Sequence, residues 1–342
     1  GTSLGGQVVG QGIVVDVSKY FTEILEINPE EKWVKVQPGV IRDDLNRYLQ
    51  PYGLMFAPET STSNRAMIGG MVGNNSCGTY SIVYGSTRNH VLELEGFLSD
   101  GSLVKFGDLT ERKFQEKLTA GGIEGDVYRH IYKLLNNDDI AENIRREFPK
   151  ASIHRRNTGY AIDELLHLQP FNKEGQHFNF CQLLAGSEGT LAFTTEIKLN
   201  LEPLPPKNKV VLCTHFHNLE ESLVAVVTAM KHQPSACELM DKIILDCTKE
   251  NIEQRKNRFF VNGDPQAILC VEFWSEDAEG MNTKANALIK DLQDAGLGYH
   301  FPVVHGKDIS RVWNLRKAGL GLLANIPGDK KAVAVIEDTA VD

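Results

Sequence analysis

The sequence predicts an α+β protein with two domains. Its 342 residues are enough for two domains of ordinary size. A proline-rich run at residues 202–206, EPLPP, ends a strand and stiffens a linker, and the pattern of the chain changes there. Glycine-rich loops, strands and one long helical block precede this run, whereas strands alternate with single helices after it. We expect domains at residues 1–204 and 205–342.

The composition argues against several classes of protein. Hydrophobic residues make up 42% of the chain and charged residues 24%, which allows a sizeable core. The net charge of −9 argues against nucleic acid as a partner, because phosphate backbones are bound by clustered Lys and Arg. No apolar run is long enough to span a bilayer. The six cysteines form no C-x-x-C pair, which is typical of a reducing compartment and offers no ligand set for an iron–sulfur cluster.

The first domain is predicted to begin with strands and one amphipathic helix. Apolar residues 13–16 indicate a short strand, and residues 32–37 alternate as a half-buried strand does. Pro38-Gly39 ends the second of these strands. A helix follows, with an acidic first turn, one apolar face and a terminal glycine: Asp43 and Asp44, then Leu45, Tyr48 and Leu49, then Gly53.

A hairpin and a helical block come next. Residues 91–98 and 103–106 are predicted strands around an Asp100-Gly101 turn. Residues 110–149 contain helical stretches, in which we expect His130 to be a packing residue. Adjacent Arg155 and Arg156, before Asn-Thr-Gly, form either an anion site or a solvated basic turn. Residues 180–184 and 191–200 are predicted strands.

The stretch from Pro58 to Gly85 is the most informative part of the chain. It holds five glycines, three asparagines and many Ser and Thr residues, with almost no charge. Glycine lets main-chain N–H groups approach a ligand closely, and consecutive N–H groups form an anion-binding concavity. A second segment of small residues, AGSEGTL, occupies positions 185–191. These segments indicate a phosphate-bearing cofactor, and a glycine-rich connector is the alternative. The pattern is neither a P-loop nor a Rossmann fingerprint.

The second domain is predicted to be a sheet backed by helices. The expected strands are Lys209–His215, Ala236–Asp241, Gln266–Trp274, Tyr299–His305 and Ala332–Thr339. The expected helices are Leu219–His232, Lys242–Asn251, Asp277–Ala295 and Ser310–Ile326. This alternation favours an antiparallel sheet of ferredoxin-like type.

Five motifs, in order, carry a family resemblance. They are GTSLGGQ at 1–7, VKVQPGVIRDDLNRYLQPYGLMFAPET at 34–60, IGGMVGNNSCG at 68–78, YGSTRNHVLELEGFLSDGS at 84–102 and LLAGSEGTLAFTTEIKLNLEPLP at 183–205. Together they resemble the FAD-binding domain of the vanillyl-alcohol oxidase (PCMH-type) flavoprotein superfamily. The branch that the chain resembles contains the D-lactate, D-2-hydroxyglutarate and glycolate dehydrogenases, especially the large forms that carry an iron–sulfur module.

The resemblance implies a PCMH-type FAD-binding domain followed by a ferredoxin-like cap domain that binds substrate. It also implies oxidation of a D-2-hydroxy acid by hydride transfer to flavin N5. We expect non-covalent FAD, because no His or Cys is a clear covalent anchor. The residues expected at the cofactor are Gly1, Thr2, Ser3, Gly6, Gln7, Pro58, Glu59, Thr60, Gly69, Gly70, Asn74, Asn75, Gly78, Tyr84, Gly85, His90, Val91, Gly186, Glu188, Gly189 and Ile197.

Two residues are expected to bind the substrate carboxylate. Arg316 matches the arginine of the family's Trp-x-x-Arg pattern, and a guanidinium grips a carboxylate bidentately. Lys331, or its neighbour Lys330, lies where the family carries a second carboxylate-binding residue. His215 and His217 form an H-x-H that could suit a metal, but no acidic third ligand follows at a recognisable spacing, and we predict no metal site.

The ends of the chain suggest a fragment. In the resembling families a glycine-rich run stands immediately before Gly-Thr-Ser, and the last residues are those of a strand. The catalytic base of those enzymes lies further along their chains, so we expect this chain to turn over poorly or not at all.

Two other interpretations stay open. The chain resembles, to a lesser degree, sugar oxidases and enolpyruvyl-sugar reductases, which share the fold but not the chemistry. It could also be a non-catalytic module of a larger protein. For a dehydrogenase, the resemblance implies an iron–sulfur module, a quinone or an electron-transfer flavoprotein as electron acceptor. It implies a cytoplasmic location, with a peripheral position at the inner membrane as the alternative.

Overall fold

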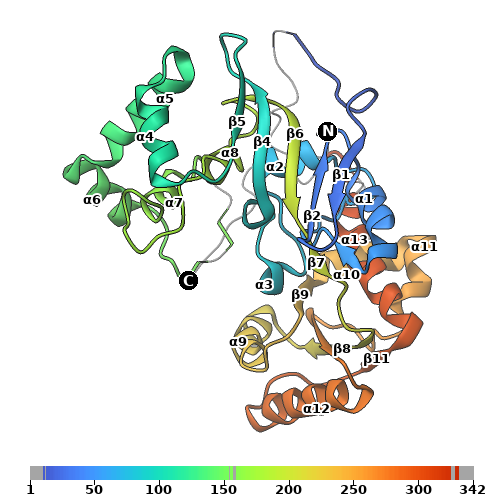
Figure 1. Cartoon of the computed structure of the whole chain (residues 1–342). Coiled ribbons are helices and arrows are strands. Elements are labelled where there is room, and N and C mark those ends of the chain that lie inside the picture. Colours follow the sequence, from blue (N-terminus) through green and yellow to red (C-terminus); the bar gives the residue numbers. More distant parts are fainter. Residues whose placement is uncertain (1–10, 12, 154, 157–158, 325–327, 331–342) are drawn as a thin grey trace. The chain divides into compact units, whose positions relative to one another are not determined.

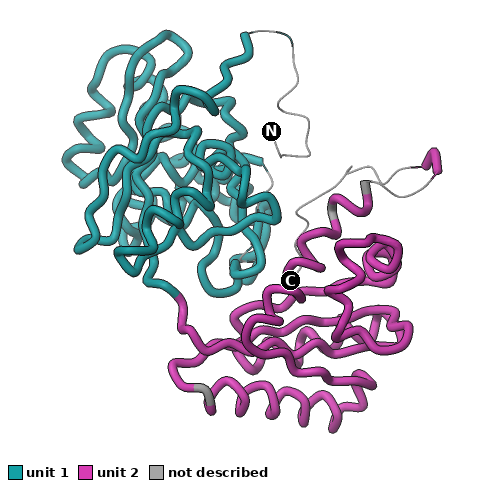
Figure 2. The backbone as a smooth tube through the Cα atoms, turned by 90° about the vertical axis from the view of Figure 1, so that its right-hand side faces the viewer, with its two compact units in different colours: residues 1–204, 335–342 teal, residues 205–334 magenta. Residues whose placement is uncertain are grey.

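The chain forms two compact units, which join between Leu204 and Pro205 (Figure 2). The computed structural model describes residues 11, 13–153, 155–156, 159–324 and 328–330. The strand expected at Ala332–Thr339 lies outside these residues. None of the helices in the described ranges combines the length and the apolarity required to cross a bilayer.

The first unit is built on an antiparallel sheet, whose five described strands lie side by side in Figure 1. In spatial order the strands are β1 (Ile24–Asn28), β2 (Trp33–Val36), β6 (Phe193–Asn200), β4 (Val91–Phe97) and β5 (Leu103–Phe106). Leu94 of β4 lies opposite Ile197 of β6, and both side chains are buried in the core. The sequence predicted each of these strands except β1.

The strand predicted at residues 13–16 is wrong. These residues have no regular structure, and Ile13 and Val14 are largely exposed. An apolar run becomes a strand only when a neighbouring strand pairs with its backbone, and none of the described strands does so here.

Short helices connect the strands of this unit. They are α1 (Arg42–Leu49), η1 (Gln50–Tyr52), α2 (Ile68–Asn74), α3 (Ser81–Tyr84) and η2 (Thr87–His90), and a small ladder pairs β3 (Leu54–Met55) with β7 (Glu202–Pro203). Leu45 and Leu49 of α1 are fully buried, as predicted. Tyr48 is exposed instead, and its ring lies beside that of Tyr52, which is also exposed. Gly53, with φ of 70°, ends η1 rather than α1.

A helical block packs around an aromatic cluster. Its helices are α4 (Glu111–Thr119), α5 (Gly122–Leu135), α6 (Asp138–Glu147) and α7 (Ile162–Leu166). Phe178 is fully buried at the centre, with ring centroids 4.8 Å from both Phe114 and Phe180. His130 was predicted to pack inside but is exposed, because the buried face of α5 carries Tyr128 and Ile131 and position 130 points away from it.

The strand predicted at residues 180–184 is a helical turn, α8 (Cys181–Leu184). The apolar run is buried, as expected, but periodicity cannot distinguish a short buried strand from a buried helical turn. The turn directs the carbonyl groups of Gln182 and Ala185 toward the Arg88 guanidinium, which binds both. A strand would point successive carbonyls in opposite directions.

The second unit is an antiparallel sheet covered by helices on both faces. The described strands are, in spatial order, β11 (Val303–His305), β8 (Asn208–Phe216), β10 (Ala267–Ser275) and β9 (Ala236–Asp241). One face packs on α9 (Leu219–Met230) and α12 (Ala278–Asp294), and the other packs on α10 (Lys242–Glu250) and α13 (Ile309–Ala324). Short turns complete it: α11 (Ile252–Arg255), η3 (Lys256–Arg258) and η4 (Gly306–Asp308).

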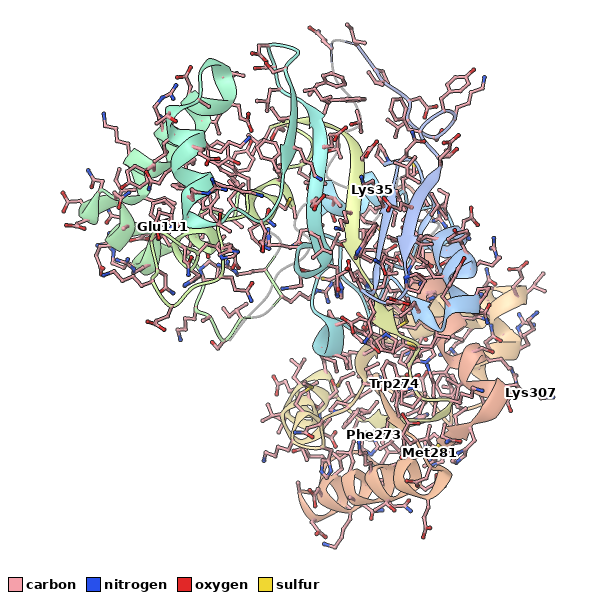
Figure 3. The ribbon with its side chains drawn as sticks, viewed as in Figure 1. Lys35, Glu111, Phe273, Trp274, Met281 and Lys307 are labelled. Atoms are coloured by element: carbon pink, nitrogen blue, oxygen red, sulfur yellow. The ribbon has the colours of Figure 1, made fainter. Side chains whose placement is uncertain are left out.

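Covering both faces explains why β8 and β10 are almost continuously apolar. In Figure 3, Phe273 and Met281 lie on the α12 side of the sheet, whereas Trp274 lies on the opposite side. The predicted α+β class is confirmed, with helices on two faces of this sheet where the sequence suggested one.

The aromatic cluster should carry much of the stability of the helical block. Replacing Phe178 with Ala leaves a cavity among four other rings, and we expect the free energy of unfolding to fall by about 3–5 kcal/mol. Phe97→Ala is the control, because Phe97 is 42% exposed and should cost less than about 1 kcal/mol. Urea denaturation followed by circular dichroism measures both changes. Equal losses in the two variants would contradict this assignment of the core.

Candidate functional site

Three segments that are far apart in the sequence meet in the first unit. We call residues 72–76, 86–90 and 182–189 the glycine junction. The Gly186 N–H donates to the Val72 carbonyl at 2.9 Å, and the Glu188 N–H donates to the Gly73 carbonyl at 2.8 Å. The structure therefore brings together the two glycine-rich stretches that the sequence singled out, main chain against main chain.

The segment at residues 86–90 joins the same junction through Asn75. This residue is fully buried and left-handed, with φ of 50°, and its side-chain oxygen accepts the Arg88 N–H at 2.8 Å. Thr87 donates both its N–H and its hydroxyl to the Ser76 carbonyl, at 3.0 and 2.7 Å. The side-chain amide of Asn74 donates to the Glu188 carboxylate at 3.1 Å, which adds a side-chain contact between residues 72–76 and 182–189.

The predicted glycines serve different purposes. A Cβ atom at Gly69 would lie 2.5 Å from Pro38 Cβ, and one at Gly78 would lie 2.2 Å from the Glu59 carbonyl oxygen. Both therefore allow the chain to pack on itself. Gly70 is different, because it is exposed, has ordinary helical geometry, and has nothing within 4 Å of the position of a Cβ. Nothing in the described part of the chain requires a glycine there, as a ligand lying against the backbone would.

His90 has one ring nitrogen without a described partner. The ring is buried, and its Nε2 lies 2.8 Å from the Tyr84 carbonyl oxygen, so Nε2 carries the hydrogen. Nδ1 is therefore an acceptor, and within the described ranges nothing donates to it. A buried acceptor of this kind fits a hydrogen-bond donor supplied from outside the protein.

The other predicted cofactor residues fall into two groups. Val91 and Ile197 are buried in the core of the sheet, whereas Pro58, Glu59, Thr60, Tyr84, Gly85 and Gly189 lie in loops or short turns and are mostly partly exposed. Arg42 donates from Nε to the Pro58 carbonyl at 3.0 Å and so anchors one of these loops. Gly1, Thr2, Ser3, Gly6, Gln7 and Lys331 lie outside the described residues.

Arg156 is not a free anion site. Its guanidinium pairs with the carboxylates of Asp163 and Glu164, and its side chain is 16% exposed. The sequence offered an anion site or a solvated turn, but this arginine is held in an internal ion-pair cluster. Asn157 and Thr158, which complete the motif, lie outside the described residues.

In the second unit, helix α13 presents Trp313 and Arg316 to two carboxylates of the sheet. Arg316 donates from Nε and Nη2 to the same oxygen of Glu238, at 2.8 and 2.6 Å. Trp313 donates its indole N–H to Glu272 at 2.8 Å, and Glu272 also accepts the Trp274 indole N–H. Of the groups that the structure describes, none bonds to Arg316 Nη1, and the side chain is 30% exposed. One edge of the guanidinium is thus held while its far end remains available.

Both ring nitrogens of His215 form hydrogen bonds within the protein, so neither is available to bind a metal ion. Its Nδ1 donates to the Cys213 carbonyl at 2.9 Å, and its Nε2 accepts the Asn262 N–H at 3.1 Å. His217 lies beyond the end of β8 and stacks on Tyr299. No group of three or more His, Cys, Asp or Glu side chains within the described ranges is arranged to hold a metal ion.

Comparison with known proteins matches both halves of the chain. Residues 1–107 match the family model described as FAD binding domain, and residues 205–342 match FAD linked oxidases, C-terminal domain. A D-2-hydroxyglutarate dehydrogenase of Pseudomonas putida is 36% identical over 349 residues, which cover 100% of this chain and 34% of that protein. The glycolate oxidase subunit GlcD of Bacillus subtilis is 27% identical over 245 residues, which cover 71% of this chain and 39% of that protein.

A solved structure supports the fold. Alkyldihydroxyacetonephosphate synthase aligns with 89% of this chain and 45% of its own, with a TM-score of 0.51 and 12% identity. At this identity the likeness shows the architecture alone. The chain spans only about a third of the length of its P. putida relative.

Acid should weaken the second unit because His215 is buried in its neutral form. Burial is the main cause that lowers the pKa of His215 from 6.5 to about 4, and His300 lowers it further. Between these two values the unfolded chain binds a proton that the folded chain does not, so the free energy of unfolding falls as the pH decreases. We expect a loss of about 2 kcal/mol from pH 7 to pH 5.

Urea denaturation at both pH values measures this loss. His215→Gln should flatten the pH dependence, although it lowers the stability at both values. His217→Gln, which alters an exposed ring, should keep the wild-type dependence. An unchanged slope in His215→Gln would show that other groups cause the acid sensitivity.

Proposed function

The chain belongs to the FAD-linked oxidase family, and from this we propose that it is the FAD-binding and substrate-binding part of a D-2-hydroxy acid dehydrogenase. The observation that carries the proposal is the match along the whole chain to D-2-hydroxyglutarate dehydrogenases. Arg316 of the second unit, which Glu238 orients, supports it. Glycolate and D-lactate are the other substrates that the related proteins suggest.

The residues of the first unit fit FAD. The main chains of two glycine-containing segments meet in the glycine junction, Gly70 leaves open space above its backbone, and His90 offers a buried acceptor. We propose that these residues, with the loops at 58–60 and 84–85, hold the cofactor without a covalent bond. Bound FAD supplies the hydride acceptor at N5.

The role proposed for Arg316 is to bind the carboxylate of the substrate. A carboxylate requires two parallel N–H donors, and the end of the guanidinium that carries Nη1 and Nη2 can provide them. Glu238 fixes the opposite edge, through Nε and Nη2, and so orients the fork before the substrate arrives. Lys331 remains a proposed second contact.

The visible absorption spectrum tests the proposal most directly. The purified chain, mixed with FAD and passed through gel filtration, should retain a flavin spectrum. Addition of D-2-hydroxyglutarate, D-lactate or glycolate should then perturb that spectrum, and bleaching would indicate that hydride transfer occurs. A chain that retains flavin but responds to none of the three acids would contradict the proposed substrate class and would favour a non-catalytic module.

Gly70→Ala should separate stability from cofactor binding. Alanine has room at this position and a better helix propensity, so the free energy of unfolding without FAD should rise by up to about 1 kcal/mol. If FAD lies against Gly70, its dissociation constant should increase at least tenfold. Gly321→Ala is the matched control, since Gly321 is also a helical glycine with open space around it. FAD affinity equal to the wild type in Gly70→Ala would remove Gly70 from the site.

Arg316→Lys should weaken substrate binding but spare the flavin. Lysine keeps the charge and loses the planar fork, so we expect at least tenfold weaker binding of the hydroxy acid, measured through the flavin spectrum. Retention of FAD should not change. Arg311→Lys, on the same helix, is the control, because Arg311 pairs with Asp308 at 2.9 Å. Equal effects of the two substitutions would argue against a specific role for Arg316.

A further inference from the structure

Arg88 is a buried cation that has no carboxylate partner among the residues that the structure describes. Its exposed fraction is 6%, and no described carboxylate lies within ion-pair distance of it. Instead, Nε donates to the Gln182 carbonyl at 2.9 Å and Nη2 donates to the Ala185 carbonyl at 2.8 Å. These acceptors lie 94 and 97 residues further along the chain. A buried arginine is costly, and burial lowers its pKa, so an arginine that serves only as packing would be a poor choice here.

The guanidinium connects two sides of the glycine junction. Backbone hydrogen bonds join residues 72–73 to 186–188, and Asn75 and Ser76 join the first segment to residues 87–88. The hydrogen bonds from the Arg88 side chain connect the remaining pair, residues 86–90 and 182–189. The three segments therefore form a closed ring of contacts in which Arg88 supplies one side.

Arg88 also defines the space beneath the turn at Gly186. A Cβ atom at this position would lie 2.9 Å from Arg88 Nη2, and the backbone φ of 95° is one that favours glycine. The guanidinium therefore fills the volume that a side chain at position 186 would need. The turn and the arginine are matched to each other.

The charges around Arg88 indicate that it contributes directed hydrogen bonds and not a net positive charge. Asp163, Glu164 and Arg156 are the charged groups that act on it, and Arg156 is paired with both carboxylates. Arg88 and Arg156 together balance the two carboxylates. Among these described groups two positive charges face two negative ones, so the directed hydrogen bonds of Arg88 are what distinguish it.

We propose that Arg88 is a positioning residue for FAD, which holds the turn from Gly186 to Gly189 in its cofactor-binding conformation through two directed hydrogen bonds to Gln182 and Ala185. The inference rests on FAD binding in the proposed function and is independent of the substrate. When only a fraction of the chain has the binding conformation, the apparent dissociation constant rises by the inverse of that fraction.

The test compares FAD binding by the full chain and by Arg88→Lys and Arg88→Met, using flavin absorbance and fluorescence. A hydrogen bond from a charged group to a buried carbonyl corresponds to a factor of at least about ten in an equilibrium constant. Arg88→Lys, which loses one of the two bonds, should raise the dissociation constant about tenfold or more, and Arg88→Met should raise it further. At saturating FAD the spectra should match the wild type, because the bound turn is the same.

Arg129→Lys is the matched control. Arg129 also binds two carbonyls, those of Leu118 and Ala120, but it lies in the helical block. This substitution should lower the melting temperature without changing FAD affinity. Arg88→Lys should instead weaken FAD binding. Most of the melting temperature that this variant loses without FAD should be recovered at saturating FAD.

Hydrogen exchange in the wild type gives a measurement that requires no variant. FAD should slow exchange at the amides of residues 186–190 more than in the helical block. Absence of that protection would overturn the inference, as would wild-type affinity in both Arg88 variants. Wild-type affinity in Arg88→Lys with a loss in Arg88→Met would also overturn it, because charge alone would then suffice. A wild-type chain that binds no FAD would instead overturn the proposed function itself.

Discussion

Contact between main chains is the constraint on which the first unit depends. The N–H groups of Gly186 and Glu188 reach the carbonyl groups of Val72 and Gly73 at 2.9 and 2.8 Å, across more than 100 residues of sequence. Two backbones can approach this closely only where side chains are small or point away. Gly186 meets this requirement with a φ of 95°, and Gly73 lies directly against the main chain of Glu188, whereas Gly69 and Gly78 allow other parts of the first unit to pack closely.

In the second unit the main constraint is the orientation of a charged side chain, Arg316, at the edge of the core. Cys270 lies opposite Glu238 across β9 and β10, so Glu238 and Glu272 share one face of the sheet. Trp313 and Arg316, three residues apart on α13, lie on one face of the helix and meet these carboxylates. These contacts fix the rotation of the helix about its axis, and Nη1 of Arg316 keeps no partner among the described residues.

The errors of the sequence-based expectations have a common origin. Residues 13–16 and 180–184 are both short apolar runs, and each was expected to be a strand. The first has no pairing partner in the described structure, whereas the second turns helically so that its carbonyls meet Arg88. His130 and Tyr48 were placed inside although each lies at the side of a buried stripe. For the two apolar runs the deciding neighbours are distant in sequence, and local pattern carries no information about them, whereas His130 and Tyr48 are errors in the helix face that is buried.

The sequence by itself determined the α+β class, the strands β2, β4, β6, β8 and β10, the glycine segments and the candidate arginine of α13. The class, the strands and the glycine segments follow from periodicity, turn residues and composition, all of which are local, whereas the candidate arginine follows from the resemblance to a family. Only the tertiary structure decided that Glu238 occupies one edge of Arg316 and that Gly70 is open while Gly69 is packed. It alone revealed that Arg88 bridges two loops more than 90 residues apart. A hydrogen bond depends on where two groups lie in space, and long-range contacts leave no periodic trace in one sequence.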